Sequence, residues 1–279
     1  MRALLLIFCA ALLLQADLVS ARSHFDRAQY EAAVEALKSD NQANPEVQFL
    51  LGKAYYMLGD YKKATEALEK AAALDPGNSD YFNWLGKAYG RRAETASVFT
   101  APGLAAKARQ AFERAVDLNP RNLEAINDLF SYYLEAPGFL GGGLEKAARL
   151  AEKIRALDPV EYEYAQAQLA VRRKEFRAAE QHFRTAMELA PRQVGRVLDL
   201  ARFLSNQGRH RESEELIARA EKLAPENPKV IFEKAQNYVR AGRNLDAARS
   251  LLEKYIRMPL GPDDPSRHEA LKLLKQLGA

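Results

Sequence analysis

The chain has 279 residues, of which 48% are hydrophobic and 28% are charged, and its formal net charge is +4. This length fits one or two compact domains, and the composition supplies enough apolar residues for a core and enough charge for a solvated surface. The net charge is too small to indicate a nucleic-acid partner. The basic clusters at 172–174 and 209–211 are each followed by Glu, which is typical of a solvated helix end and not of a nucleic-acid-binding patch.

Residues 1–16 have the pattern of a secretory signal peptide. Met1-Arg2 precedes an uncharged apolar run, residues 3–14, which is too short to span a membrane and is followed by small-residue cleavage sites ending at Ala16 and Ala21. Cleavage after Ala16 leaves residues 17–28 intact, a segment that aligns with residues 48–59, whereas cleavage after Ala21 cuts it. We therefore predict a signal at 1–16, with 1–21 as the alternative. The competing interpretation is a buried first helix of the fold.

The only cysteine, Cys9, lies inside this predicted signal. The remainder of the chain then has no disulfide, no Cys-based zinc site and no thiol nucleophile. An export signal without disulfides suits a bacterial periplasmic protein, so we expect a periplasmic or secreted location.

An internal repeat organises the rest of the chain. A small residue is followed twelve positions later by a proline seven times, and one offset kept so often marks a repeat architecture. The pairs are Ala33–Pro45, Ala64–Pro76, Ala108–Pro120, Ala147–Pro159, Ala179–Pro191, Ser213–Pro225 and Ala247–Pro259.

The unit at 48–76 predicts two helices joined by a tight turn. Its apolar and small residues recur at helical spacings, and Gly59-Asp60 interrupts them. Gly52 and Ala64 are small enough for the two helices to approach closely, and Pro76 cannot continue a helix.

This spacing and residue order resemble the tetratricopeptide repeat (TPR) family. In the second full unit the resemblance is carried by Phe82, Leu85, Gly86, Tyr89, Ala108, Phe112, Ala115 and Pro120. The resemblance covers residues 17–259 and implies an all-α, right-handed α-solenoid of about seven helix pairs that binds other proteins. Residues 260–279 are expected to form a capping helix, with Ser266 and Glu269 as its capping box and Leu271, Leu274 and Leu277 as its apolar stripe.

Two inserts break the period, near residues 91–107 and 135–146. Both contain Ala-Pro-Gly followed by an apolar residue, and Gly141-Gly142-Gly143 permits backbone angles closed to other residues. We expect both inserts to project from one edge and to touch. One interpretation is enlarged turns that shield the core with Phe99, Leu104, Phe139 and Leu140, and the other is a lip that contacts a ligand. Similar inserts occur in exported bacterial TPR proteins, a resemblance that implies no activity.

The resemblance assigns partner binding to the first helix of each unit, which lines the concave groove. The predicted groove residues are a mixture of aromatic, amide and cationic side chains, which suits an extended or helical peptide of apolar and acidic character. They are Phe49, Lys53, Tyr56, Asn83, Lys87, Arg91, Asn127, Tyr164, Arg202, Asn206, Phe232, Gln236 and Arg240. The Lys/Asn carboxylate clamp of some TPR domains is incomplete here, because Phe49 and Ser131 replace two of its cations.

No catalytic set accompanies the repeat. None of the four histidines has a second histidine three to five residues away, the glycine loop lacks the residues of a P-loop, and no Gly-x-Ser-x-Gly elbow exists. We therefore expect a non-enzymatic protein without cofactor or metal. The first hypothesis is an interaction scaffold or adaptor for a peptide or partner protein, and the alternative is a chaperone-like or regulatory subunit of an envelope enzyme or assembly system.

Overall fold

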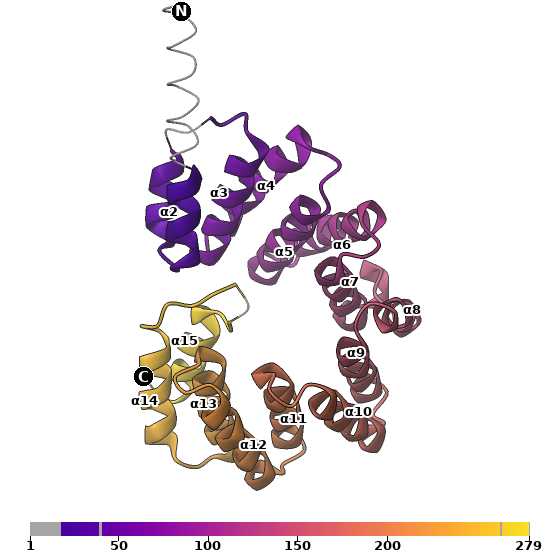
Figure 1. Ribbon diagram of the computed structural model, residues 1–279, viewed down its shortest axis with the longest axis vertical. Helices are drawn as coiled ribbons and strands as arrows, with labels where there is room; N and C mark the ends of the chain where they lie inside the picture. Colours follow the sequence, from indigo (N-terminus) through magenta and orange to yellow (C-terminus); the bar gives the residue numbers. More distant parts are fainter. Residues whose placement is uncertain (1–17, 39–40, 263, 279) are drawn as a thin grey trace, which may run out of the picture. The chain divides into compact units, whose positions relative to one another are not determined.

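A computed structural model describes residues 18–38, 41–262 and 264–278 (Figure 1). These residues form helices and contain no strand. The chain divides into two compact units, residues 1–150 and 151–279. The predicted signal peptide at 1–16 lies outside the described residues.

Unit 1 is a succession of helical hairpins, drawn in indigo to magenta in Figure 1. Residues 18–26 are helical and precede the first numbered helix. The helices that follow are α2 (Tyr30–Leu37), α3 (Pro45–Met57), α4 (Tyr61–Leu74), α5 (Ser79–Thr95), α6 (Ala101–Leu118), α7 (Leu123–Glu135), the short 3₁₀ helix η1 (Gly138–Leu140) and α8 (Leu144–Arg155), which crosses into unit 2.

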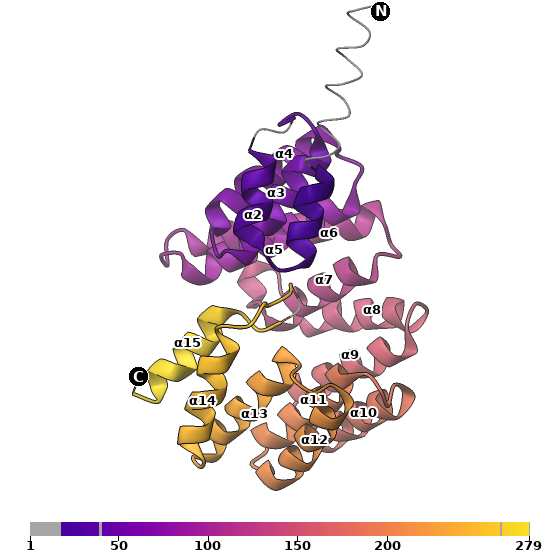
Figure 2. The same cartoon turned by 60° about the vertical axis from the view of Figure 1, so that its left-hand side comes forward.

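Unit 2 continues the same plan and ends on a single helix. In the view of Figure 2, α15 lies beside α14, and both α14 and α15 contact α13. The helices are α9 (Pro159–Arg172), α10 (Phe176–Leu189), α11 (Val194–Asn206), α12 (His210–Leu223), α13 (Pro228–Ala241), α14 (Leu245–Tyr255) and α15 (Arg267–Gln276). The all-α helical-repeat fold predicted from the sequence is confirmed.

Asparagine and aspartate caps set where most of the first helices begin. Each side-chain oxygen accepts a hydrogen bond from a backbone N–H of the first helical turn, which has no partner within the helix. These caps are Asn44, Asn78, Asn122, Asp158 and Asn227. Because a cap fixes the first residue of a helix, it also fixes which side chains share its exposed face.

Glycine in the first helix allows the second helix to pack closely, as the sequence predicts. A Cβ on Gly52 would lie 2.5 Å from Leu68 Cγ and 3.3 Å from the Ala64 carbonyl oxygen. A Cβ on Gly86 would lie 2.5 Å from the Phe112 ring. The facing position on the second helix is a fully buried small residue in Ala64, Ala108, Ala147, Ala179 and Ser213.

The last repeat departs from the predicted register by one residue. Ala247 is exposed, whereas Ala248 is fully buried and occupies the position three residues after the start of α14 that Ala64 occupies in α4. The turn before α14 contains two left-handed residues, Gly242 with φ of 63° and Asn244 with φ of 52°. The turns before α14 and α4 each have three residues, but α13 has 14 residues where α3 has 13, so the buried face of α14 is shifted by one residue. The twelve-residue offset from Ala247 to Pro259 therefore does not mark equivalent positions.

The first insert is mostly helical rather than an enlarged turn. Residues 91–95 extend α5, residues 101–107 belong to α6, and the connection is confined to residues 96–100. Pro102 lies in the first turn of α6, where its missing N–H costs no helical hydrogen bond. The sequence suggested a turn there because Pro-Gly is common in turns, yet proline is equally suited to a helix start.

The second insert is a glycine loop that packs on α6. Gly141 has φ of 88°, and a Cβ on Gly142 would lie 1.8 Å from the Ala136 carbonyl oxygen, so both positions require glycine. A Cβ on Gly141 would also lie 2.8 Å from Arg109 Cδ, so this loop packs against α6. Arg109 follows the last residue of the first insert by two positions. The shielding interpretation is wrong for the two aromatic tips: Phe99 is 92% exposed and Phe139 is 83% exposed.

The C-terminal helix α15 is capped as predicted but buries a different stripe. Ser266 Oγ accepts a hydrogen bond from the backbone N–H of Glu269 at 3.3 Å. Ala270 and Leu274 are buried, whereas Leu271 is 51% exposed, so the stripe does not include Leu271. No helix in the described part of the chain combines the length and the apolar character needed to cross a membrane.

Candidate functional site

The first helices of unit 1 bring five of the predicted groove residues onto one face. Four of them are half-buried, but Asn83 is only 1% exposed, which corrects its assignment to the open groove. Helix α3 contacts α5, and α5 contacts α7. Residues four apart lie on the same side of a helix, so Phe49 and Lys53 share one side of α3, and Asn83 and Lys87 share one side of α5. Trp84 on α5 contacts both Phe49 and Lys53. Tyr56 completes the set. We call this face, together with Trp84, the Lys53 surface.

Lys53 is the centre of this face. Its Nζ lies 4.8 Å from the centroid of the Phe25 ring, 5.4 Å from that of Phe49 and 4.9 Å from that of Trp84. An ammonium group over aromatic faces is attracted by the negative face of each ring. Lys53 forms no ion pair with any described residue. Burial lowers the pKa of Lys53, and the negative charges of nearby Glu124 and Asp26 oppose this shift. The site therefore holds a half-buried cation that forms no direct ion pair with a described carboxylate.

The aromatic side chains around Lys53 hold one another in place. The rings of Tyr56 and Trp84 meet edge to face at 5.5 Å, and those of Phe49 and Trp84 do so at 6.4 Å. Phe49 also lies 4.7 Å from the Tyr81 ring. Such pairs are rigid and present apolar area at low entropic cost.

Lys87 differs from Lys53 because it is paired. Its Nζ lies 2.5 Å from Glu124 Oε1 and 3.2 Å from Asp128 Oδ2, and it also lies 4.9 Å from the Trp84 centroid. Burial opposes its charge, yet the two carboxylates raise the pKa of Lys87 above its ordinary value. Asn83 Nδ2 donates to Asp128 Oδ2 at 2.9 Å, while Asn83 Oδ1 is buried with no hydrogen-bond partner among the described residues.

The two remaining predicted groove residues of unit 1, Arg91 and Asn127, are not part of the Lys53 surface. Arg91 pairs with Glu94 at 2.7 Å and lies over the Tyr61 ring at 5.5 Å. Asn127 is half-buried, and its neighbour Asp128 makes the contacts to α5.

In unit 2 the predicted arginines are neutralised internally. Arg202 Nε donates to Glu233 Oε2 at 2.8 Å, and Arg240 pairs with Glu233 Oε1 at 3.2 Å. The Glu233 side chain is only 1% exposed. Glu233 is therefore paired with two guanidinium groups, and neither arginine is an unpaired cation.

Phe232 is a core residue, which corrects its assignment to the groove. It is 4% exposed and its ring lies 5.2 Å from that of Tyr255. Tyr164 is half-buried, with the Arg196 guanidinium 4.4 Å above its ring. Gln236 is half-buried, and Asn206 is exposed at the end of α11.

A further ion network joins α9 to α11. Arg196 pairs with Glu161 at 2.5 Å and with Asp199 at 3.1 Å, and Arg202 lies 3.7 Å from Asp199. Burial raises the pKa of Asp199 to about 6, with Arg196 and Arg202 opposing the shift and Glu161 and Glu233 adding to it. Burial also raises the pKa of Glu161.

The sequence analysis missed the residues that the cations Lys53, Lys87 and Arg202 contact on the next first helix, although a regular separation in the sequence marks these residues. Lys53 meets Trp84 and Arg202 meets Glu233 across 31 positions in each case, and Lys87 meets Asp128 across 41, where the first insert intervenes. In all three cases the receiving residue directly follows a predicted groove position: Asn83, Asn127 or Phe232. Of these three contact partners, only Trp84 is uncharged.

No group of three or more His, Cys, Asp or Glu residues in the described ranges is arranged to hold a metal ion. The closest histidine contact to a carboxylate joins His182 Nδ1 and Glu163 Oε2 at 2.6 Å.

Residues 45–78 and 170–230 match family models described as tetratricopeptide repeat. A thermophilic TPR protein of Thermus thermophilus is 22% identical, with a TM-score of 0.57, and the match covers 68% of this chain and 98% of that one. A tetratricopeptide repeat protein of Parabacteroides merdae is 15% identical, with a TM-score of 0.63, and the match covers 96% of this chain and 99% of that one. No curated protein sequence matches the chain. The matched segments and the shared fold together support a TPR protein.

Proposed function

We propose that the chain is a non-enzymatic interaction scaffold whose Lys53 surface binds an acidic segment of a partner protein. TPR repeats generally mediate protein–protein interaction, which supports the general class. The single observation that carries the assignment to this surface is the Lys53 ammonium group, which lies among three aromatic rings and has no carboxylate partner among the described residues.

The chemistry of the site favours a carboxylate as the ligand group. Burial lowers the pKa of Lys53, and in this less solvated position an incoming carboxylate gains more Coulomb energy than it would beside an exposed lysine. The half-buried rings of Phe49 and Tyr56 offer apolar area beside it. A segment with a carboxylate next to an apolar side chain matches both features.

Peptide selection tests the proposal. Random twelve-residue peptides displayed on phage are selected on the immobilised full chain, and the recovered peptides are measured by fluorescence anisotropy. We expect enrichment in Asp and Glu beside apolar residues, and a loss of about tenfold in affinity for Lys53→Gln. Lys234→Gln is the matched control, because Lys234 is already paired with Glu221 at 3.0 Å.

Phe49→Ala provides a second variant with an intact fold. Phe49 is half-buried, so its truncation should weaken peptide binding while the far-UV circular dichroism spectrum stays unchanged. Peptides that lack acidic residues, or that bind wild type and Lys53→Gln equally, would argue against the proposal.

A chaperone-like role is the second candidate, and exposed apolar side chains in the inserts favour it. Val98, Phe99 and Phe139 are each more than 80% exposed. A chaperone-like protein would bind many unrelated unfolded segments, so suppression of aggregation of several unrelated denatured proteins would favour this role over the scaffold.

We also propose export with cleavage after Ala16. Ala21 is fully buried in the core of unit 1 and Leu18 packs against that core, so cleavage after Ala21 would remove core contacts that cleavage after Ala16 preserves. N-terminal sequencing of the mature protein should begin at Asp17. A start at Arg22, or an intact Met1, would contradict this proposal.

A further inference from the structure

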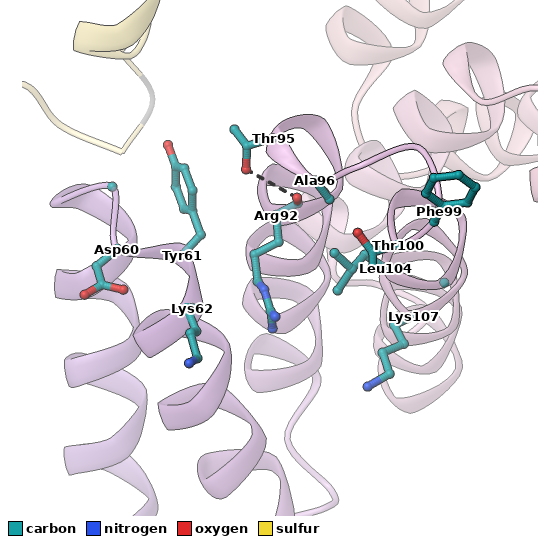
Figure 3. A pocket seen from close by; sticks show the side chains of 12 residues that line it. Asp60, Tyr61, Lys62, Arg92, Thr95, Ala96, Phe99, Thr100, Leu104 and Lys107 are labelled. Carbon is teal, nitrogen blue, oxygen red and sulfur yellow. Dashed lines mark hydrogen bonds between the residues drawn. The ribbon is translucent and has the colours of Figure 1, made fainter.

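The first insert builds a pocket on unit 1 that is separate from the Lys53 surface. The pocket has a volume of about 760 Å³ and lies among the start of α4, the end of α5 and the start of α6 (Figure 3). More than half of its lining residues belong to the insert at 91–107, which breaks the repeat period. The pocket is therefore a product of the insert and not of the repeat itself.

Three cations border this pocket from three helices. Figure 3 shows the charged ends of Lys62 on α4, Arg92 on α5 and Lys107 on α6 on the same side of it. None of the three forms an ion pair with a described residue: Arg92 donates to Thr65 Oγ1 at 2.8 Å, and Lys107 lies over the Tyr89 ring at 5.2 Å.

The only carboxylate that lines the pocket is already engaged. Asp60 caps α4 through the backbone N–H of Lys63 and pairs with Lys63 Nζ at 2.7 Å. The local charge of the pocket is thus positive. Clustered cations without counter-charges raise the local concentration of anionic ligands and favour their binding.

The pocket also has an apolar side. Phe99 is 92% exposed on the 96–100 turn, and the half-buried side chains of Leu104 and Tyr61 also line the pocket, with Tyr61 on the side opposite Phe99 (Figure 3). An aromatic side chain held this far out of the core gains nothing from folding. It supplies contact area to any segment that enters the pocket.

We propose that this insert pocket is a second docking site, which binds an acidic segment of a partner protein that also carries a large apolar side chain. The three cations receive its carboxylates, and Phe99 and Leu104 receive its apolar side chain. The site does not depend on the Lys53 surface, so a partner can engage either one alone.

The test starts from Lys53→Gln protein, in which the first surface is disabled. Random twelve-residue peptides displayed on phage are selected on this variant, and affinities of the recovered peptides are measured by anisotropy. We expect acidic peptides with an aromatic or large aliphatic residue, and a loss of about tenfold in the added double variant Lys62→Gln/Lys107→Gln. The added pair Lys70→Gln/Lys222→Gln removes the same charge from two exposed lysines that do not line the pocket, and should leave binding unchanged.

Phe99→Ser separates the apolar contribution from the charge. Because Phe99 is almost fully exposed, the substitution should spare the fold and weaken the same peptides severalfold. Three results would overturn the proposal: no acidic peptides recovered, equal loss in the two lysine pairs, or full displacement of the peptides by millimolar pyrophosphate with no effect of Phe99→Ser, which would indicate a simple anion site. Because the peptides are selected on Lys53→Gln protein, these affinities do not depend on whether the Lys53 surface binds a partner.

Discussion

The ammonium group of Lys53 lies 4.9 Å from the centroid of the Trp84 ring, where the equivalent cations Lys87 and Arg202 meet Asp128 and Glu233. This position carries a cation in three of the repeats, whereas Ser131 occupies it in α7 and Gln236 in α13. The partner of the cation is a carboxylate in two of the three cases and an indole in one. An indole attracts the charge without neutralising it. Lys53 therefore keeps a net charge that a ligand can use, whereas its two equivalents do not.

Phe232→Ala should destabilise the protein rather than impair binding alone. Phe232 is buried against Tyr255, and truncation of a buried phenylalanine costs about 3–5 kcal/mol through lost burial and a cavity. Urea unfolding of the full chain measures the change, with Gln236→Ala on the half-buried face of the same helix as the control. A variant of wild-type stability would place Phe232 on the surface and restore its original groove assignment.

Glu233→Gln should be the most damaging of the charge substitutions. It leaves Arg202 and Arg240 without their shared buried carboxylate, and loss of a charged hydrogen-bond partner typically costs about 1–3 kcal/mol. Glu221→Gln removes an exposed pair with Lys234 and should stay close to wild type. Thermal unfolding followed by circular dichroism compares the two, and equal midpoints would contradict the buried network.

Asp199 should make stability fall as pH rises. Its pKa is raised from 3.8 to about 6 in the folded protein, so protonation favours the folded state. This stabilisation is complete below about pH 4 and is lost as pH rises through about 6. Asp199→Asn keeps the shape of the side chain without its charge, so the variant does not lose this stabilisation. The free energy of unfolding of the variant relative to wild type should therefore increase as pH rises through this window, by up to about 3 kcal/mol.

Urea unfolding at a series of pH values between about 4 and 7 checks the Asp199 prediction. Because Glu161, Glu233, Arg196 and Arg202 are present in both proteins, the difference between the two curves isolates Asp199 and its coupling to them. Parallel curves, or a wild type that gains on the variant with rising pH, would contradict a raised pKa.

Gly86→Ala and Gly90→Ala should have opposite effects although both lie within α5. A Cβ on Gly86 would lie 2.5 Å from the Phe112 ring, and overpacking of this kind typically costs about 1–3 kcal/mol. A Cβ on Gly90 meets no atom within 4 Å, so alanine there should stabilise the helix by up to about 1 kcal/mol. Differential scanning calorimetry measures both midpoints, and a drop at Gly90 equal to that at Gly86 would contradict the close packing of α5 on α6.

The helical hairpins and their close packing followed from the sequence because Gly52, Gly86 and the buried small residues report helix contact directly. The register of the last repeat was predicted wrongly at Ala248, because α13 is one residue longer than α3 and the added residue moves the buried face of α14 while the proline offset stays. The ion pairs were missed because a sequence shows charges but not which neighbouring helix receives them. Phe232 was misplaced for the same reason, since a groove position on one repeat can be a core position near the C-terminal cap.

The most direct test of the Lys53 surface is NMR of the protein with ¹³C-dimethylated lysines, titrated with a selected acidic peptide. The Lys53 resonance is assigned by its loss in Lys53→Gln, and Lys234, paired with Glu221, serves as the internal reference. We predict that the Lys53 signal moves in step with peptide binding while the Lys234 signal stays in place. A Lys53 signal that does not move while the peptide binds would contradict the assignment of the partner site to this surface.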